Sequence, residues 1–252
     1  MMRFLLLAMV LVAIYFLVRW AISQMQISSA SPATEETEKT EHFLLPGKYT
    51  VEDRLEQIGE SARTRLRPLF ERAGVPYPPE KVALLGFKKE KFLDLYAAAP
   101  GGAYHFIHTY PILAASGGPG PKLQEGDRQV PEGFYEIESL NPNSRFHLSL
   151  RLNYPNPEDL LRAGEDGRAV EDLGGDIMIH GRSSSVGCLA LGDTAIEELF
   201  VLLAEMDLSA ARVILSPCDF RTDATVDLPE DAPAWTPALH DNIRQELRSF
   251  RH

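Results

Sequence analysis

The chain has 252 residues, of which 44% are apolar and 24% charged. This composition is typical of a globular protein that is long enough for one large core or two small ones. The net charge of -11 argues against nucleic-acid binding, because phosphate recognition requires a basic surface. The two cysteines, Cys188 and Cys218, are too few for a disulfide framework.

The N-terminus carries the features of an export signal. A short basic start, Met1-Met2-Arg3, precedes an apolar run from Phe4 to Val18. At about 15 residues this run is short for a membrane-spanning helix and suits the apolar part of a secretory signal. Arg19-Trp20 would instead favour an interfacial anchor. Residues 1–27 are therefore predicted to be a signal peptide or a membrane anchor. Either one places the rest of the chain outside the cytoplasm, in the periplasm or an equivalent compartment, with inner-membrane association if the segment is retained.

The next segments are predicted in chain order. Residues 28–47 are rich in Ser, Thr, Glu and Lys and are predicted to be a flexible linker. Residues 48–80 are predicted to hold a helix that Thr50 and Asp53 cap at its start and Gly74 ends. Apolar runs and alternation predict strands at 82–87, 92–96, 104–113, 133–137, 146–152, 177–180 and 212–215.

Two further helices complete the pattern. Thr194 and Glu197 have the spacing of a capping box that opens a helix, and residues 241–250 form an amphipathic stretch. A catalytic segment is expected over 81–220, followed by a helical C-terminal extension, 221–252. The pattern predicts an α+β fold, mainly β, in which a mostly antiparallel sheet is flanked by helices.

The chemistry centres on His180 and Cys188. An apolar strand ends in His180, a Gly/Ser loop follows, and Gly187 precedes Cys188. An imidazole beside a thiol can act as its base, and Gly187 leaves room for a substrate carbonyl to approach the backbone. The positive end of the helix that follows is expected to lower the pKa of the thiol.

The same residues admit other interpretations. Asp176, His180 and Cys188 would form a metal site, but no second Cys or His lies at zinc spacing near Cys188, so no metal or other cofactor is expected. A purely structural role for the His–Cys pair also stays open. His108, on a strand face, is typical of a packed core histidine and is kept as a candidate wall of the substrate pocket. Cys218 is expected to be buried and structural.

Three segments together resemble a known family. The stretch from His180-Gly181 to Gly187-Cys188 is similar to the catalytic motif of L,D-transpeptidase (YkuD-type) domains. The stretch from Gly126 to Tyr135 looks like the family's Thr-Pro-x-Gly-x-Tyr/Phe element. Residues 117–126 and Asn153-Tyr154-Pro155-Asn156 resemble its YafK-like branch. The resemblance spans roughly residues 81–220, in the expected order.

The chain also departs from the usual motif. Val186 stands where typical members have a second histidine, and Ala190 where they have an arginine; the loop between His180 and Cys188 is also short. The YafK-like branch shares this shortened pattern. Because the arginine is missing, the type of reaction is open. Hydrolysis is expected to compete with transfer to an amine acceptor.

The resemblance implies a YkuD-type fold and an exported cysteine enzyme that acts on peptidoglycan stem peptides through a thioester. It implies Cys188 as nucleophile, His180 as base, and an oxyanion site around Gly187 with Ser185 and Gly181 in the same loop. The expected substrate contacts are Lys122, Tyr154 and Asn156, together with His108. The rival hypothesis is a non-catalytic peptidoglycan-binding module that keeps the fold.

Overall fold

The computed structural model describes residues 48–222 and 224–250, and its first helix is α2, Val51–Ala73. Thr50 and Asp53 exchange the two hydrogen bonds of a capping box, and Gly74 ends the helix at a left-handed φ of 69°. The predicted start and end of this helix are therefore confirmed. The predicted signal or anchor and the whole of the predicted linker lie outside the described residues. Within the described residues, no helix combines the length and apolar character needed to cross a membrane.

One sheet of eight strands dominates the described residues, in the order β3-β2-β1-β8-β4-β5-β6-β7. The pairs β1–β8 and β6–β7 are parallel, and the other neighbours are antiparallel. The strands are β1 Lys81–Phe87, β2 Phe92–Ala98, β3 His105–Pro111, β4 Gly133–Asn141, β5 Ser149–Leu152, β6 Met178–His180, β7 Leu189–Ala190 and β8 Ala211–Ser216. The predicted α+β class with a mainly antiparallel sheet is confirmed.

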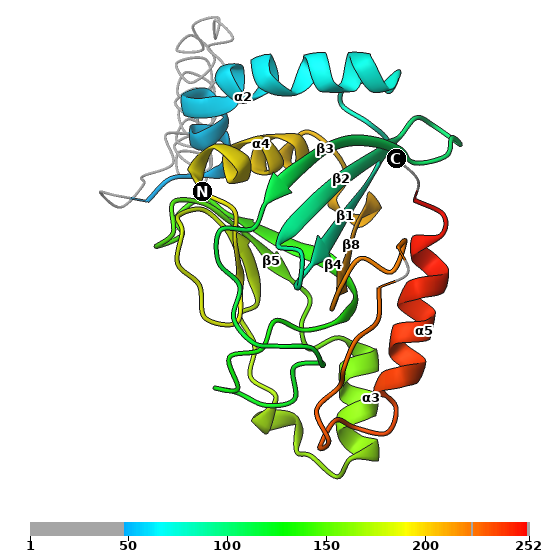
Figure 1. The fold of residues 1–252 in the computed structure, drawn as a ribbon. Coiled ribbons are helices and arrows are strands. Elements are labelled where there is room, and N and C mark those ends of the chain that lie inside the picture. The colour runs from blue at the N-terminus through cyan, green and yellow to red at the C-terminus, as the bar shows by residue number, and fades with distance from the viewer. Residues whose placement is uncertain (1–47, 223, 251–252) are drawn as a thin grey trace, which may run out of the picture. The chain divides into compact units, whose positions relative to one another are not determined.

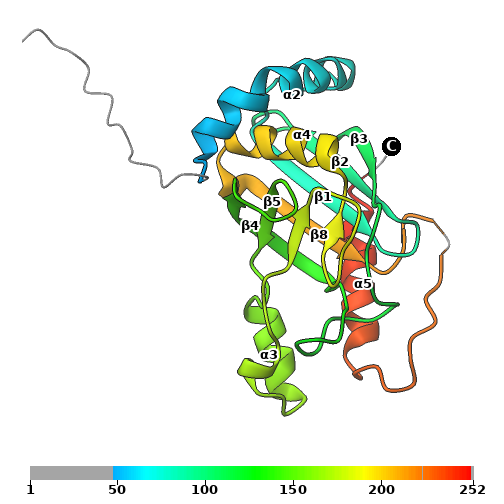
Figure 2. The same ribbon diagram turned by 90° about the vertical axis from the view of Figure 1, so that its left-hand side faces the viewer.

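Helices cover both faces of this sheet. The side chains of Val82 and Leu84 pack in one core with α2 and α4, Asp193–Ala204. Ala83, Leu85 and Phe87 point the other way, into a second core with α5, Thr236–Leu247. Figures 1 and 2 show α2 and α4 together on one side of the sheet and α5 on the other. Burial on both faces explains why β1 is an uninterrupted apolar run rather than an alternating one.

The two edges of the sheet are joined by a short backbone contact between the segment after β3 and strand β7. Leu113, beyond the end of β3, donates its N–H to the Ala190 carbonyl at 2.8 Å, and the Ala190 N–H donates to the Ala114 carbonyl at 2.9 Å. This isolated bridge pairs Ala114 with Ala190 in β7. The segment after β3 is thereby held beside the loop that carries Cys188.

Some elements differ from the predictions. The predicted Thr194–Glu197 capping box is wrong, because α4 has Gly192 at its N-cap and no side-chain capping bond. Glu197 instead binds His147 and Arg65. Helix α3, Pro157–Glu165, was not predicted, and α5 starts earlier than the amphipathic pattern suggested.

Candidate active site

His180 and Cys188 lie at the neighbouring ends of two paired strands. His180 ends β6, Cys188 directly precedes β7, and the parallel register pairs Ile179 with Leu189 and His180 with Ala190. The sequence predicted this proximity from the short loop between the two residues. In the described structure, however, no hydrogen bond joins the imidazole to the thiol. Each group has its own partner, and these partners define the resting state of the site.

The His180 imidazole is buried, with 1% of the residue exposed. Its Nδ1 lies 2.6 Å from the carbonyl oxygen of Gly181. A carbonyl can only accept a hydrogen bond, so Nδ1 carries the proton and Nε2 keeps its lone pair. Burial lowers the pKa of the imidazole, and the bond to the Gly181 carbonyl opposes this only in part. The ring is therefore neutral at pH 7, with Nε2 ready to accept a proton.

Gly181 occupies a space that no side chain would fit. A Cβ there would lie 2.6 Å from the Phe146 carbonyl oxygen and 2.8 Å from Asp193 Oδ1. This close packing explains the glycine after the histidine. The hydrogen bond that orients His180 comes from the backbone, because the carbonyl of Gly181 accepts from Nδ1.

The Cys188 thiol is half-buried, and its Sγ donates to the Asp176 carbonyl at 3.6 Å. Burial raises the pKa of the thiol. The backbone N–H of Met178 opposes the increase, the Asp176 charge adds to it, and the Lys122 charge opposes it. The expectation of a lowered thiol pKa is therefore wrong. At the start of α4, Asp193 Oδ1 accepts the Arg182 N–H at 2.8 Å. The site rests as a neutral thiol and a neutral imidazole.

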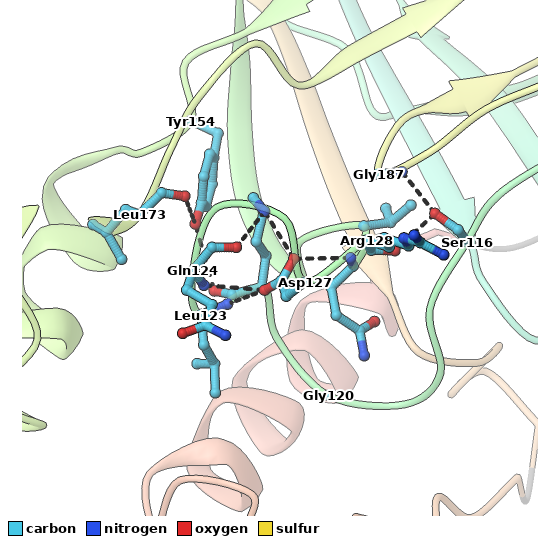
Figure 3. A network of polar contacts seen from close by, with 12 residues as sticks. Ser116, Gly120, Leu123, Gln124, Asp127, Arg128, Tyr154, Leu173 and Gly187 are labelled. Atoms are coloured by element: carbon cyan, nitrogen blue, oxygen red, sulfur yellow. Dashed lines mark hydrogen bonds and ion pairs between the residues drawn. The ribbon is translucent and has the colours of Figure 1, made fainter. Parts of the chain in front are cut away.

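The backbone donors expected for the oxyanion are already in use. The Gly187 N–H donates to Ser116 Oγ at 2.6 Å (Figure 3). The Cys188 N–H donates to Ser185 Oγ at 3.0 Å. Gly187 has a φ of 84°, a left-handed conformation that favours glycine. An incoming carbonyl oxygen must therefore share or replace a hydroxyl partner. Ser185, predicted as a loop residue of the site, holds the backbone of Cys188.

Ser116 is a residue that the sequence analysis missed. Its hydroxyl accepts from Gly187 and donates to the Arg128 carbonyl at 2.7 Å, so it ties the Cys188 loop to the facing loop (Figure 3). No local pattern marks it, because its partner lies 71 residues away in the chain. The facing loop also comes close elsewhere, since the Gln129 carbonyl is 3.6 Å from the position of a Cβ on Gly187.

Asp127 organises that facing loop. Its carboxylate accepts from Lys122 Nζ at 2.8 Å, from the backbone N–H groups of Leu123 and Gln129 at 2.8 and 2.9 Å, and from that of Gln124 at 3.0 Å (Figure 3). Burial alone would raise the pKa of Asp127, but these hydrogen bonds outweigh it and lower the pKa. The loop beside Cys188 is thus held in one conformation by a buried ion pair.

The predicted substrate contacts separate into two groups. Lys122 pairs with Asp127 and acts electrostatically on Cys188, and the Tyr154 hydroxyl lies 3.5 Å from the Lys122 carbonyl. Asn156 and His108 lie elsewhere: Asn156 caps α3 and donates to the Phe134 carbonyl, and His108 packs edge-on against Tyr110. Of these four residues, Lys122 is the one whose charge acts on the Cys188 thiol.

Among the described residues, no group of three or more His, Cys, Asp or Glu side chains could hold a metal ion. Cys188 and Cys218 are both free. Cys218 is fully buried in the core beneath α5, where burial raises the pKa of its thiol to about 11. Its location suits a structural role.

Comparisons with known proteins agree with the motif. A family model of the L,D-transpeptidase catalytic domain (YkuD) matches residues 101–215. YafK of Escherichia coli (strain K12), whose name assigns it provisionally to the L,D-transpeptidases, is 38% identical over 116 residues. That alignment covers 45% of this chain and 44% of YafK, so the match spans less than half of either protein.

Solved structures give weaker likenesses. The helical cell shape determining protein Pgp2 from Campylobacter jejuni is 21% identical with a TM-score of 0.45, over 63% of this chain and 56% of that one. L,D-transpeptidase 1 from Mycobacterium tuberculosis is 12% identical with a TM-score of 0.32, over 54% and 62%. Both TM-scores are below 0.5, so the assignment depends on the sequence matches. These show that residues 101–215, which include both His180 and Cys188, are similar to the L,D-transpeptidase (YkuD) catalytic domain.

Proposed function

We propose that the protein is an exported cysteine enzyme that acts on the stem peptides of peptidoglycan. The observation that carries this proposal is the neutral His180 imidazole, whose Nε2 lone pair is unprotonated on the strand adjacent to Cys188. A base in that state can take the thiol proton when substrate arrives. The family match over residues 101–215 supplies the substrate class.

The reaction would proceed in two steps. His180 Nε2 takes the proton from Cys188 Sγ, and the sulfur attacks an amide carbonyl next to a D-centre of diaminopimelate. The C–N bond breaks, the imidazolium returns its proton to the leaving amine, and a thioester remains. In the second step an amine or water attacks the thioester, His180 takes its proton, and the thiol is regenerated.

The resting hydrogen bonds make proton transfer dependent on substrate. The thiol proton faces the Asp176 carbonyl rather than His180, and burial favours both neutral forms. A substrate that displaces the contact with Asp176 would redirect the thiol toward the imidazole. Such a site keeps its nucleophile protonated, and therefore protected from oxidation and alkylation, until substrate is bound.

Hydrolysis is favoured slightly over transfer. Val186 and Ala190 replace the histidine and arginine of typical members, so an acceptor strand lacks a charge-assisted hydrogen bond of about 1.5–3 kcal/mol. Water needs no such contact. Ala190 is buried, and its backbone N–H and carbonyl are hydrogen-bonded to Ala114 and Leu113. These backbone groups are therefore used within the sheet.

The test is turnover of disaccharide tetrapeptide, alone and with excess amine acceptor, followed by mass spectrometry. We expect cleaved products with the intact chain and none with Cys188→Ala. Cys218→Ala is the matched control and should retain activity, because that thiol is buried away from the site. Full turnover by Cys188→Ala would refute the cysteine mechanism. Cross-linked dimers as the main product would refute the hydrolytic preference alone.

Two parts of the proposal are tested separately. A non-catalytic binding module would bind peptidoglycan equally well with and without the Cys188 thiol and release no product. Export is tested by fusing a reporter after residue 60 and measuring whether it works only outside the cytoplasm. A reporter active only in the cytoplasm would contradict export.

A further inference from the structure

The catalytic imidazole has an aromatic neighbour that none of the motifs includes. The Phe146 ring stacks on the His180 ring, with centroids 4.4 Å apart and planes inclined by 28°. Phe146 is 39% exposed, whereas His180 is 1% exposed. The phenyl ring therefore lies between the imidazole and the solvent. Removing it would uncover one face of the base.

An unusual turn places Phe146 in this position. His147 has a φ of 76°, and the Leu148 N–H donates to the Phe146 carbonyl at 3.1 Å, which closes a three-residue turn. A positive φ is strained for a residue with a side chain and persists only where neighbouring contacts impose it. The Gly181 N–H donates to the Leu148 carbonyl at 3.1 Å, so the turn is also bonded to the residue after His180.

Glu197 supplies the contact that holds the turn. His147 Nε2 lies 2.9 Å from Glu197 Oε1, and Arg65 Nη2 lies 3.3 Å from Glu197 Oε2. One carboxylate thus connects three elements: the turn, α4 through Glu197 itself, and α2 through Arg65. All three side chains are partly buried, which limits screening by solvent.

We propose that Phe146 is a positioning residue for the His180 imidazole, held over it by the chain of contacts Arg65–Glu197–His147. Helix α2 then supports the site although it lies outside the matched segment 101–215. This inference rests on the proposed function only in assigning His180 as the base. The geometry of the stack and of the three contacts stands without it.

The experiment compares Glu197→Ala with Glu205→Ala in the purified full chain. Glu205, at the end of α4, also ties this helix to α2 through Arg63 at 2.6 Å and binds Tyr77, beyond the end of α2, at 2.8 Å, but the structure shows no contact between it and His147. Both variants should lower the unfolding temperature by a few degrees. Only Glu197→Ala should shift the NMR titration of His180 toward higher pH and lower kcat about tenfold.

Phe146 is tested directly in parallel. Phe146→Ala should shift the His180 titration in the same direction. Phe146→Tyr keeps an aromatic ring at this position and should therefore match the wild-type protein in titration and turnover. Because Phe146 is partly exposed, both variants should fold, which preserves the test if Glu197→Ala does not.

Two results would overturn the inference. One is an unchanged His180 titration in both Glu197→Ala and Phe146→Ala. The other is an equal shift in Glu205→Ala, which would indicate a general loss of stability. The titration is measured without substrate, so the result is distinct from any failure of the proposed function, which would show as no product from the wild-type chain.

Discussion

The Ser116 hydroxyl accepts the N–H of Gly187 at 2.6 Å and donates to the Arg128 carbonyl at 2.7 Å. One small side chain therefore satisfies a buried amide in the Cys188 loop and joins that loop to the one organised by Asp127. The relationship makes the two loops a single unit around the thiol.

Replacing Ser116 by alanine should destabilise this unit. The Gly187 N–H would lose its partner, which costs about 1–3 kcal/mol for a buried donor. We expect a lower unfolding temperature and reduced turnover. Ser249→Ala, whose hydroxyl bonds only within the C-terminal turn, is the control and should match wild type in both measurements. Wild-type turnover in Ser116→Ala would show that the tie does not matter for catalysis.

Alkylation of Cys188 should show no enhanced reactivity at neutral pH. Burial raises the pKa of the thiol above 9.0, its ordinary value, so the thiolate forms only in more alkaline solution. We expect the iodoacetamide rate, followed by mass spectrometry in Cys218→Ala, to rise only above about pH 9. His180→Ala should leave that profile unchanged. A neutral-pH plateau that disappears in His180→Ala would instead reveal a preformed thiolate–imidazolium pair.

Turnover should extend further into acid than an ordinary histidine allows. Burial lowers the pKa of His180 below 6.5, so the base becomes protonated only below that pH. We expect kcat/KM on tetrapeptide substrate to stay level on the acid side and to fall only below about pH 6.5. His180→Ala should lower turnover about a hundredfold or more. An acid limb above pH 7 would contradict the buried, neutral state of the imidazole.

Gly181→Ala should be poorly tolerated. The added methyl would meet the Phe146 carbonyl at 2.6 Å and Asp193 Oδ1 at 2.8 Å, so the backbone must shift. Overpacking of this kind costs about 1–3 kcal/mol. Gly164→Ala is the matched control, since a Cβ there meets nothing within 4 Å in helix α3. Chemical denaturation of the two variants should show a loss for the first and no loss for the second.

The contribution of Asp159 to the stability of the fold should fall as pH rises through about 6. Burial raises the pKa of Asp159 to about 6, against about 3.9 for an unfolded chain. The folded state therefore binds this proton more tightly. The associated stability is full below about pH 4 and is lost as pH rises through 6. Asp159→Asn should flatten this slope in urea denaturation between pH 4.5 and 7, whereas the exposed Asp231→Asn should not. A slope unchanged by Asp159→Asn would contradict the assignment.

Local patterns predicted the elements whose signals are local. Thr50, Asp53 and Gly74 bound α2 as expected, because caps act within one turn of chain. The start of α4 was mispredicted because Glu197 is recruited by His147 and Arg65, which are distant in sequence. Long-range partners of this kind outweigh a capping preference of about 1 kcal/mol.

The site was predictable in the same partial way. His180 and Cys188 could be identified because a strand, a glycine-rich loop and a thiol follow one another in the chain. Their protonation states could not, because burial is set by residues such as Phe146 that are remote in sequence. Asn156 was assigned to substrate from a motif, but its side chain caps α3.

The central position of β1 has a consequence for biosynthesis. β1 pairs with β2 on one edge and, in parallel, with β8 on the other, where Leu84 lies opposite Val213. As the chain leaves the ribosome, the β1–β2 hairpin can form early, but its second edge stays open until β8 has been synthesised. This delay leaves one edge of an apolar strand unpaired while residues 99–210 emerge. Late pairing of this kind slows folding and exposes the nascent protein to aggregation.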